Sequence, residues 1–176
     1  MKILLLGKTG QVGKSIIKAN DKKNQIISFD KFEMPLDNIK KLEKNLSSVL
    51  KKNDFDILIN AAAFTNVEQS EEETKLAKTI NSDSLAIITK ELYKTKDKKN
   101  TLLIHFSTDY VFDGSGITPW KPENKTNPIN AYGASKVGGE LNIFSSDIPY
   151  ILLRTSWVFS ETNNNFFLKI LDKIKK

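Results

Sequence analysis

Short apolar runs alternate with longer amphipathic stretches along the chain. Five runs have the length of strands, several without polar alternation: Ile3–Leu6, Gln25–Phe29, Ile57–Ile59, Thr101–Phe106 and Tyr150–Leu153. Such strands are typical of parallel sheets, which are buried on both faces. The amphipathic stretches lie around residues 11–20, 38–52, 74–94 and 131–145. They are long enough to be crossover helices that join parallel strands. The pattern predicts an α/β fold, a Rossmann-like doubly wound parallel sheet.

The last stretch, FFLKILDKIKK, has apolar residues at helical spacing. These residues are Phe166, Phe167, Ile170, Leu171 and Ile174. No capping signal follows them. Two interpretations stay open: a terminal helix with an exposed apolar face, or a sequence that is cut short.

Length and composition limit the chemistry. A chain of 176 residues with 39% hydrophobic residues suits one well-packed domain. It has no cysteine and a single histidine, His105, which excludes a thiolate site or a histidine cluster for a metal. No apolar run approaches the ~20 residues of a membrane span, and no secretory signal is seen. We therefore expect a cytoplasmic protein with no membrane partner and no metal ligands in its site.

The net charge of +6 raises the question of nucleic acid. Nearly all of the positive charge is lysine scattered over the presumed helix faces, and Arg154 is the only arginine. Arginine forks are the groups that usually recognise bases and phosphates. A solvated lysine-rich surface explains the pattern more simply, so we expect no nucleic-acid partner.

The opening residues, MKILLLGKTGQVG, place Gly7, Gly10 and Gly13 directly after the first apolar run. Gly7-Lys8-Thr9 resembles the end of a phosphate loop, but Lys2 stands where that loop needs its first glycine. The remaining pattern favours a tight strand-to-helix turn with a helix N-terminus aimed at a phosphate. The alternative is a strand, turn and helix with no ligand.

Two further stretches fit a dinucleotide. Asp30 ends the second apolar run about 20 residues beyond the glycine turn, where a carboxylate can accept the ribose hydroxyls of a dinucleotide and disfavour a 2′-phosphate. An aspartate that caps a local turn is the alternative. In DILINAAAFTNVEQSE, the small residues after Asn60 allow a flat cofactor to lie against the backbone.

The sequence Tyr132-Gly133-Ala134-Ser135-Lys136 places a phenol and an ammonium one helical turn apart, on the same face. A neighbouring cation lowers the pKa of a phenol and suits it to proton exchange near neutral pH. A lone pair of this kind is more often structural. Here it follows HFSTDYVFDG, in which Thr108 can hold a carbonyl against the tyrosine.

The ordered motifs GKTGQVG, NAAAFTNVEQSE, STDYVFDG, YGASK and RTSWVFS, with Trp120 between the third and the fourth, resemble the extended short-chain dehydrogenase/reductase superfamily. Within it, they are most similar to the dTDP-4-dehydrorhamnose reductase family. The resemblance implies NAD(P)H-dependent reduction of the 4-keto group of dTDP-4-dehydro-L-rhamnose, with NADPH or NADH as cofactor and a nucleotide sugar as substrate.

The resemblance also implies residue roles. The catalytic candidates are Thr108, Tyr132 and Lys136. The cofactor-binding candidates are Gly7, Gly10, Gln11, Val12, Gly13, Asp30, Asp37, Asn38, Ala63, Phe64, Thr65, Tyr132 and Lys136. The spacing of Asp37 and Asn38 is shifted from the family pattern, and Phe64 stands where the family often has histidine or a polar aromatic residue. The substrate candidates are Thr108, Asp109 and Trp157.

The family continues beyond this length into a smaller domain over the sugar nucleotide, so the substrate domain is largely missing here. Residues 1–176 are interpreted as the cofactor-binding part of a longer reductase, a half complemented by a separate C-terminal segment, or a remnant that only binds nucleotide. A homodimer and a magnesium ion at a subunit interface stay open. The alternatives are a nucleotide-sugar epimerase or dehydratase and a non-catalytic regulatory subunit. A dehydratase needs an Asp-Glu pair after the threonine, where this chain has Asp109-Tyr110.

Overall fold

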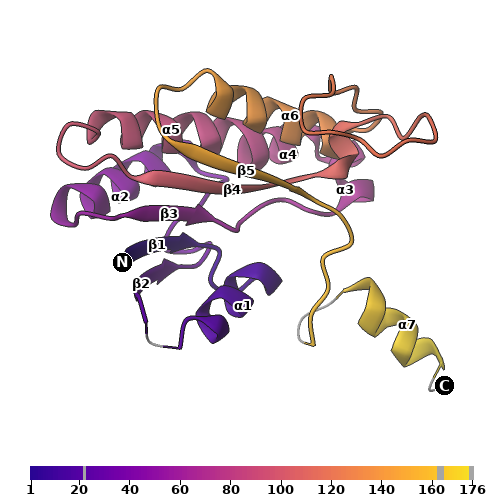
Figure 1. The fold of residues 1–176 in the computed structure, drawn as a ribbon, viewed down its shortest axis with the longest axis horizontal. Helices are drawn as coiled ribbons and strands as arrows, with labels where there is room; N and C mark the ends of the chain where they lie inside the picture. Colours follow the sequence, from indigo (N-terminus) through magenta and orange to yellow (C-terminus); the bar gives the residue numbers. More distant parts are fainter. Residues whose placement is uncertain (22, 162–164, 175–176) are drawn as a thin grey trace.

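A five-stranded parallel sheet forms the centre of the molecule (Figure 1). The computed structural model describes residues 1–21, 23–161 and 165–174. The strands are β1 (Lys2–Leu6), β2 (Gln25–Phe29), β3 (Ile57–Asn60), β4 (Leu102–Thr108) and β5 (Tyr150–Thr155), in the order β2-β1-β3-β4-β5. Every neighbouring pair runs parallel, which confirms the predicted doubly wound sheet.

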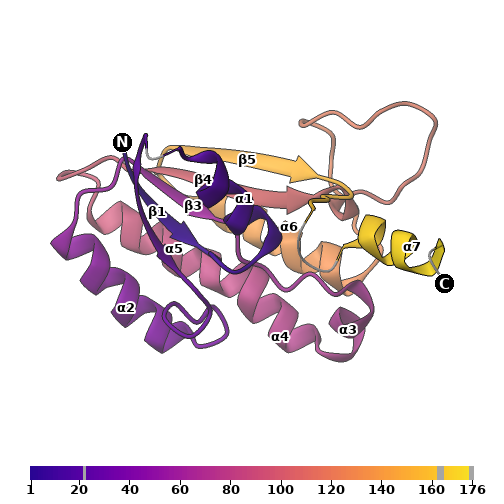
Figure 2. The ribbon, with the colours of Figure 1, turned by 90° about the horizontal axis from the view of Figure 1, so that it is seen from below.

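Helices cover the two faces unequally (Figure 2). They are α1 (Gln11–Ala19), α2 (Ile39–Lys52), α3 (Val67–Glu72), α4 (Thr74–Lys78), the π-helix η1 (Thr79–Asp83), α5 (Ser84–Lys94), the 3₁₀-helix η2 (Asp109–Val111), α6 (Ala131–Phe144) and α7 (Phe166–Ile174). One face carries α2, α5 and α6 side by side, and α1 lies on the other (Figures 1 and 2).

The alternation of strand side chains creates an apolar cluster on each face. On the α2 and α5 side, Leu4 and Leu58 are fully buried against Leu42 and Ile88. On the α1 side, Leu5 belongs to a smaller cluster with Ile3, Ile59 and Ile16. Because β1 is buried on both faces, it carries no polar alternation and shows the continuous apolar pattern seen in the sequence.

Strands β4 and β5 extend further than their apolar runs. Ser107 pairs with Arg154 and Thr108 with Thr155, so the ladder continues through polar residues to the edge where the site lies. Helix α3 is short and polar, so hydrophobic periodicity does not reveal it. Its start is fixed by Asn66, whose side chain accepts a hydrogen bond from Gln69 N.

The helix expected over residues 74–94 is divided into α4, η1 and α5. At the π-helical turn the backbone approaches α6 closely, because two glycines of α6 face it. A methyl group at Gly139 would lie 2.2 Å from the carbonyl oxygen of Asn81, and one at Gly138 would lie 2.6 Å from Ser82 Oγ. The turn therefore places the buried Asn81 side chain between α6 and the loop that follows β3.

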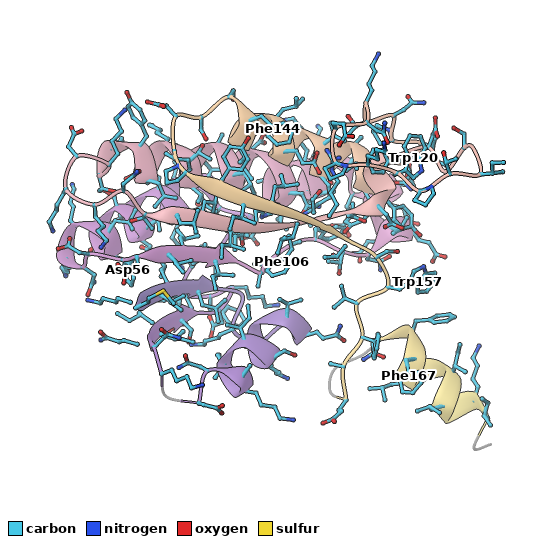
Figure 3. All side chains as sticks on the ribbon, in the orientation of Figure 1. Asp56, Phe106, Trp120, Phe144, Trp157 and Phe167 are labelled. Atoms are coloured by element: carbon cyan, nitrogen blue, oxygen red, sulfur yellow. The ribbon has the colours of Figure 1, made fainter. Side chains whose placement is uncertain are left out.

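Helix α7 confirms the helical spacing seen in FFLKILDKIKK, while Lys175 and Lys176 lie outside the described residues. Figure 3 shows Trp157 beyond the end of β5, on the side of α7, and its ring packs edge-on against Phe166 at 4.7 Å. Phe166 and Phe167 are still about half exposed. Among the described helices, none is long and apolar enough to cross a membrane.

Candidate active site

A cavity of about 950 Å³ lies at the carboxyl ends of the strands, where the strand order reverses between β1 and β3. Its wall contains nearly every residue predicted for the site: Gly7, Gly10, Gln11, Val12, Asp30, Asp37, Ala63, Phe64, Thr65, Thr108, Asp109, Tyr132, Lys136 and Trp157. Segments far apart in the sequence therefore meet around one volume large enough for a dinucleotide-sized ligand.

The glycine turn leaves backbone at the cavity wall. Gly7 adopts φ +88, and a side chain there would meet the backbone of Ala61 and Ala62 at 2.9 Å. Gly10 is the N-cap of α1 and provides no side chain to cap it, and the first turn contains no acidic residue. The positive end of the helix dipole is thus uncompensated by carboxylates, which suits a phosphate.

Two predicted cofactor residues lie outside the cavity wall. Gly13 is buried, and a methyl group there would lie 2.1 Å from Gly7 O. The missing side chain of Gly13 therefore allows α1 to pack closely on the glycine turn. Asn38 is exposed and caps α2, because its Oδ1 accepts from Lys41 N at 3.1 Å. The shifted spacing thus brings Asp37, but not Asn38, to the cavity.

Asp30 fits both interpretations given above. It lines the cavity, and its Oδ1 accepts from Phe32 N at 2.9 Å and from Glu33 N at 3.1 Å. Lys8 Nζ lies 2.6 Å from a Glu33 oxygen and 3.6 Å from Asp30 Oδ2. The backbone donors, chiefly that of Glu33, lower the pKa of Asp30, with a smaller contribution from Lys8. Asp30 is therefore a carboxylate at neutral pH.

The loop after β3 is fixed by hydrogen bonds from the buried side chain of Asn81. Its amide accepts from Phe64 N and donates to Phe64 O, both at 2.9 Å, and donates to Ser135 Oγ at 2.9 Å. Ser135 Oγ in turn donates to Tyr132 O at 2.6 Å. This connection, which the sequence analysis missed, ties the loop of Ala63, Phe64 and Thr65 to the helix that carries Tyr132.

Tyr132 differs from expectation in its electrostatics. Burial raises the pKa of its phenol, a hydrogen bond with Thr108 lowers it, and the charge of Asp109 raises it further. The expectation that Lys136 lowers this pKa is wrong, because burial dominates. Tyr132 is thus a protonated phenol at neutral pH, the form that a proton donor requires.

Lys136 lines the cavity, and only 1% of its surface is exposed. Its Nζ donates to Phe106 O at 2.7 Å and lies 3.2 Å from His105 Nε2. Burial lowers the pKa of Lys136 to about 8, although the charge of Glu140 opposes the shift. The ammonium and amine forms are therefore both accessible near neutral pH.

An ionic network around the buried Glu140, behind the cavity, was also missed. Arg154 binds Glu140 through two hydrogen bonds, and Ser107 Oγ donates to Glu140 Oε1 at 2.5 Å. The Arg154 guanidinium also lies over the Phe112 ring, which stacks on Trp120. Glu140 follows Lys136 by one turn on α6, so the helical spacing in YGASKVGGE could have indicated a third member of the Tyr132 face.

The substrate candidates lie together at one end of the cavity. Thr108 Oγ1 donates to Asp109 Oδ1 at 3.1 Å, and Ser156 Oγ donates to Asp109 Oδ2 at 2.7 Å. Trp157 adopts φ +50, a conformation that bulky residues rarely take, and its side chain is 68% exposed. In the described residues, no three acidic, histidine or cysteine side chains gather in a way that could hold a metal ion.

These features define a Rossmann-like α/β protein with a tyrosine and a lysine, one helical turn apart, in the wall of its cavity. The chain belongs to the family described as RmlD substrate binding domain, whose model matches residues 1–176.

Relatives with known names support this placement. The chain is 34% identical to the dTDP-4-dehydrorhamnose reductase of Salmonella typhimurium and 35% identical to that of Escherichia coli, in each case over the whole chain and 58% of the relative. It thus spans little more than half the length of these relatives.

Solved structures give the same result. The dTDP-4-dehydrorhamnose reductase of Clostridium acetobutylicum superposes with a TM-score of 0.89 at 30% identity, over 99% of this chain and 60% of that one. The Bacillus anthracis enzyme, solved in complex with NADP, gives 0.89 at 30% identity, over 99% and 59%.

Proposed function

We propose that residues 1–176 are the cofactor-binding part of an NAD(P)H-dependent reductase that converts dTDP-4-dehydro-L-rhamnose to dTDP-L-rhamnose. The observation that carries this proposal is the convergence of Thr108, Tyr132 and Lys136 on the cavity that also contains the glycine turn. The named relatives are similar along the whole chain, and one is known in complex with NADP.

The residues present fit a nicotinamide dinucleotide. The uncapped start of α1 offers backbone N–H groups to the pyrophosphate, and the Asp30 carboxylate offers oxygen to the adenosine ribose. Ala63 and Phe64 would lie along the far side of the ligand, while Lys136 would bond the nicotinamide ribose. When bound in its reduced form, the dinucleotide supplies a hydride to the ketone carbon.

The chain's own groups supply the proton. Negative charge grows on the ketone oxygen during reduction, and Tyr132 can neutralise it by donating its phenolic proton. Thr108, which hydrogen-bonds with that phenol, would hold the oxygen in line. Asp109 and Trp157 would contact the sugar.

The sugar nucleotide needs more surface than this cavity offers. Trp157 and the apolar face of α7 are exposed beside it. We therefore propose that the 176-residue chain binds NADPH alone but turns over slowly, because substrate positioning is worth several kcal/mol. The segment that the relatives have beyond this length, in cis or as a second polypeptide, would restore turnover.

The test uses this chain fused to the remaining C-terminal segment of the Salmonella relative, with dTDP-4-dehydrorhamnose as substrate and NADPH oxidation as the signal. Tyr132→Phe should lower kcat by roughly 100-fold or more, because a positioned acid contributes about that factor. NADPH affinity should change little. Tyr93→Phe, an exposed tyrosine on α5, is the matched control and should leave kcat unchanged.

A fusion that reduces the substrate equally well with Tyr132→Phe would overturn the assigned proton donor. Full activity from the 176-residue chain alone would overturn the need for a further segment. NADPH binding without reduction by the fusion would instead favour the non-catalytic regulatory subunit.

A further inference from the structure

His105 is buried behind the cavity, and the proposed reaction gives it no part. It is 1% exposed and lies on β4 between Asn60 of β3 and Lys136 of α6. Its Nδ1 lies 3.2 Å from Asn60 Nδ2, and its Nε2 lies 3.2 Å from Lys136 Nζ. Both ring nitrogens therefore have a polar partner.

The orientation of the Asn60 amide determines where the imidazole proton lies. Ala62 N donates to Asn60 Oδ1 at 3.2 Å, which turns Nδ2 toward the ring. An amide nitrogen only donates, so Nδ1 of His105 accepts and the proton of the neutral ring lies on Nε2. Nε2–H then points at Lys136 Nζ.

A donor at Nε2 requires a lone pair on Nζ. An ammonium has three donors and no acceptor, whereas an amine has a lone pair. With an amine, every contact is matched: Asn60 donates to His105, His105 donates to Nζ, and Nζ donates to Phe106 O at 2.7 Å. With an ammonium, two donors face each other across the 3.2 Å contact.

The surroundings of Lys136 bring its amine form within reach of mildly alkaline pH. Burial lowers the pKa of Lys136 to about 8, opposed by Glu140 of α6. Glu140 is itself paired with Arg154 of β5. Tyr132, also on α6, is a neutral phenol whose pKa is raised by burial and by Asp109 of η2. Burial lowers the pKa of His105 well below 6.5, a charge on Lys136 lowers it further, and a hydrogen bond with the Asn60 backbone only partly opposes these effects, so the ring stays neutral in either form of Lys136.

We propose that Asn60, His105 and Lys136 form a directed hydrogen-bond chain built for an uncharged Lys136, in which His105 is the positioning residue, and that charging Nζ releases it from His105 toward the cavity. Nζ takes that proton from solvent, which reaches it through the cavity. Its remaining N–H groups then turn to Phe106 O and to whatever ligand is bound.

Binding of a dinucleotide follows from this arrangement, and this step rests on the proposed function. The negative charge of a pyrophosphate favours the ammonium form of Lys136. A dinucleotide that arrives above pH 8 therefore draws a proton onto Nζ.

Because the chain contains a single histidine, its ring nitrogens can be observed without assignment after ¹⁵N labelling. We expect the chemical shift of Nε2 to show an inflection near pH 8, where Lys136 titrates. The ring should be the Nε2–H tautomer both below and above that inflection. Lys136→Met should abolish the inflection. Lys90→Met, which removes an exposed lysine paired with Glu43 on the protein surface, should leave it in place. An Nδ1–H tautomer, or an inflection that survives Lys136→Met, overturns the proposal.

Asn60→Asp provides a second test that does not depend on the folding of Lys136→Met. The aspartate keeps the size of asparagine and still accepts from Ala62 N, but its carboxylate accepts from Nδ1–H. The ring should switch to the Nδ1–H tautomer, and the inflection should move above pH 8 because Nε2 then accepts from an ammonium. A ring that keeps its Nε2–H tautomer in this variant contradicts the directed chain.

Titration calorimetry tests the proton taken up with the dinucleotide. NADPH binding is measured at pH 9 in two buffers of different ionisation enthalpy. Uptake of up to one proton is expected at pH 9, much less at pH 6.5, and none with Lys136→Met. Binding without uptake at pH 9 overturns the release step. If NADPH does not bind at all, the proposed function is overturned instead. The hydrogen-bond chain of Asn60, His105 and Lys136 is then tested by the histidine spectra alone.

Discussion

Arg154 binds both carboxylate oxygens of Glu140, with Nε 3.0 Å from Oε1 and Nη2 2.7 Å from Oε2. The two side chains are 15% and 1% exposed. This pair joins β5 to α6, and Ser107 Oγ adds β4 to the same carboxylate. Glu140 lies on the helix that carries Tyr132 and Lys136, so the pair fixes that helix against the strand ends that form the cavity.

Replacing Arg154 by leucine should therefore destabilise the chain strongly. The Glu140 carboxylate would stay buried without its partner, and breaking a buried pair in this way costs about 3–5 kcal/mol. Urea unfolding monitored by circular dichroism measures the change. Arg154→Lys should recover only part of the loss, because an ammonium cannot form the fork.

The matched control is the exposed pair between Lys18 and Glu161, whose side chains are 81% and 87% exposed. Lys18→Ala should leave the urea midpoint unchanged within error, because exposed pairs contribute little. If both variants lose the same free energy of unfolding, the Arg154–Glu140 pair stabilises the chain no more than an exposed ion pair does.

A second prediction concerns Gly10 and Gly13 of the glycine turn, where the same substitution should have different effects on stability and on NADPH binding. Gly13→Ala should cost about 1–3 kcal/mol of stability, since its methyl group would lie 2.1 Å from Gly7 O and α1 must move. At Gly10, the nearest atom to a new methyl group is 3.4 Å away. Gly10→Ala should therefore keep the stability but weaken NADPH binding about tenfold or more, because the methyl group enters the cavity wall.

Urea unfolding and titration calorimetry separate these two effects. A stable Gly13→Ala variant would contradict the packing assigned to that position. Unchanged NADPH affinity in Gly10→Ala would show that the dinucleotide does not lie over the turn.

Cofactor choice should depend only modestly on Asp30. Its carboxylate repels a 2′-phosphate, whereas the nearby Lys8 offsets part of its charge. At an exposed rim such effects change affinity by roughly tenfold. We expect a Kd ratio between NADPH and NADH within about a thousandfold, and a shift of roughly tenfold toward NADPH in Asp30→Asn. Fluorescence titrations with both cofactors give the ratios, and Glu43→Gln, remote from the cavity, should not change them.

Much of the fold was predictable because buried parallel strands have a continuous apolar sequence. Strand β2 begins and ends where predicted, at Gln25 and Phe29. The ends of β4 and β5 were not predictable from hydrophobicity, because Ser107 and Arg154 continue the ladder with polar side chains. Both side chains bind Glu140, which comes from a different part of the sequence.

The candidate site also has features that could be predicted from the sequence and features that could not. Motif order placed Tyr132 and Lys136 in the cavity wall, as the structure has them. Their protonation could not be predicted from spacing, because burial by the rest of the molecule sets both pKa values. Asn38 lies outside the cavity wall for a local reason. It occupies the N-cap of α2, where its side chain is used to satisfy a helix N–H group.

The last prediction concerns the stability cost of Lys136. Its pKa falls from 10.5 to about 8 on folding, so the folded state binds its proton less tightly than the unfolded state. Below pH 8 both states are protonated and the cost is complete, at about 3 kcal/mol. Between pH 8 and 10.5 only the unfolded state holds the proton, and stability rises with pH through this window until the cost is gone.

At pH 7, Lys136→Met removes that cost and the hydrogen bond to Phe106 O, worth about 1 kcal/mol, whereas an ammonium makes no bond to the Nε2–H of His105. The variant should therefore be more stable than the parent by about 2 kcal/mol at pH 7. Its advantage should shrink and reverse as the pH rises from 8 to 10.5, while the variant loses NADPH-dependent proton uptake. Urea unfolding at several pH values measures the difference. A difference that does not vary over that window would show that Lys136 titrates like an exposed lysine.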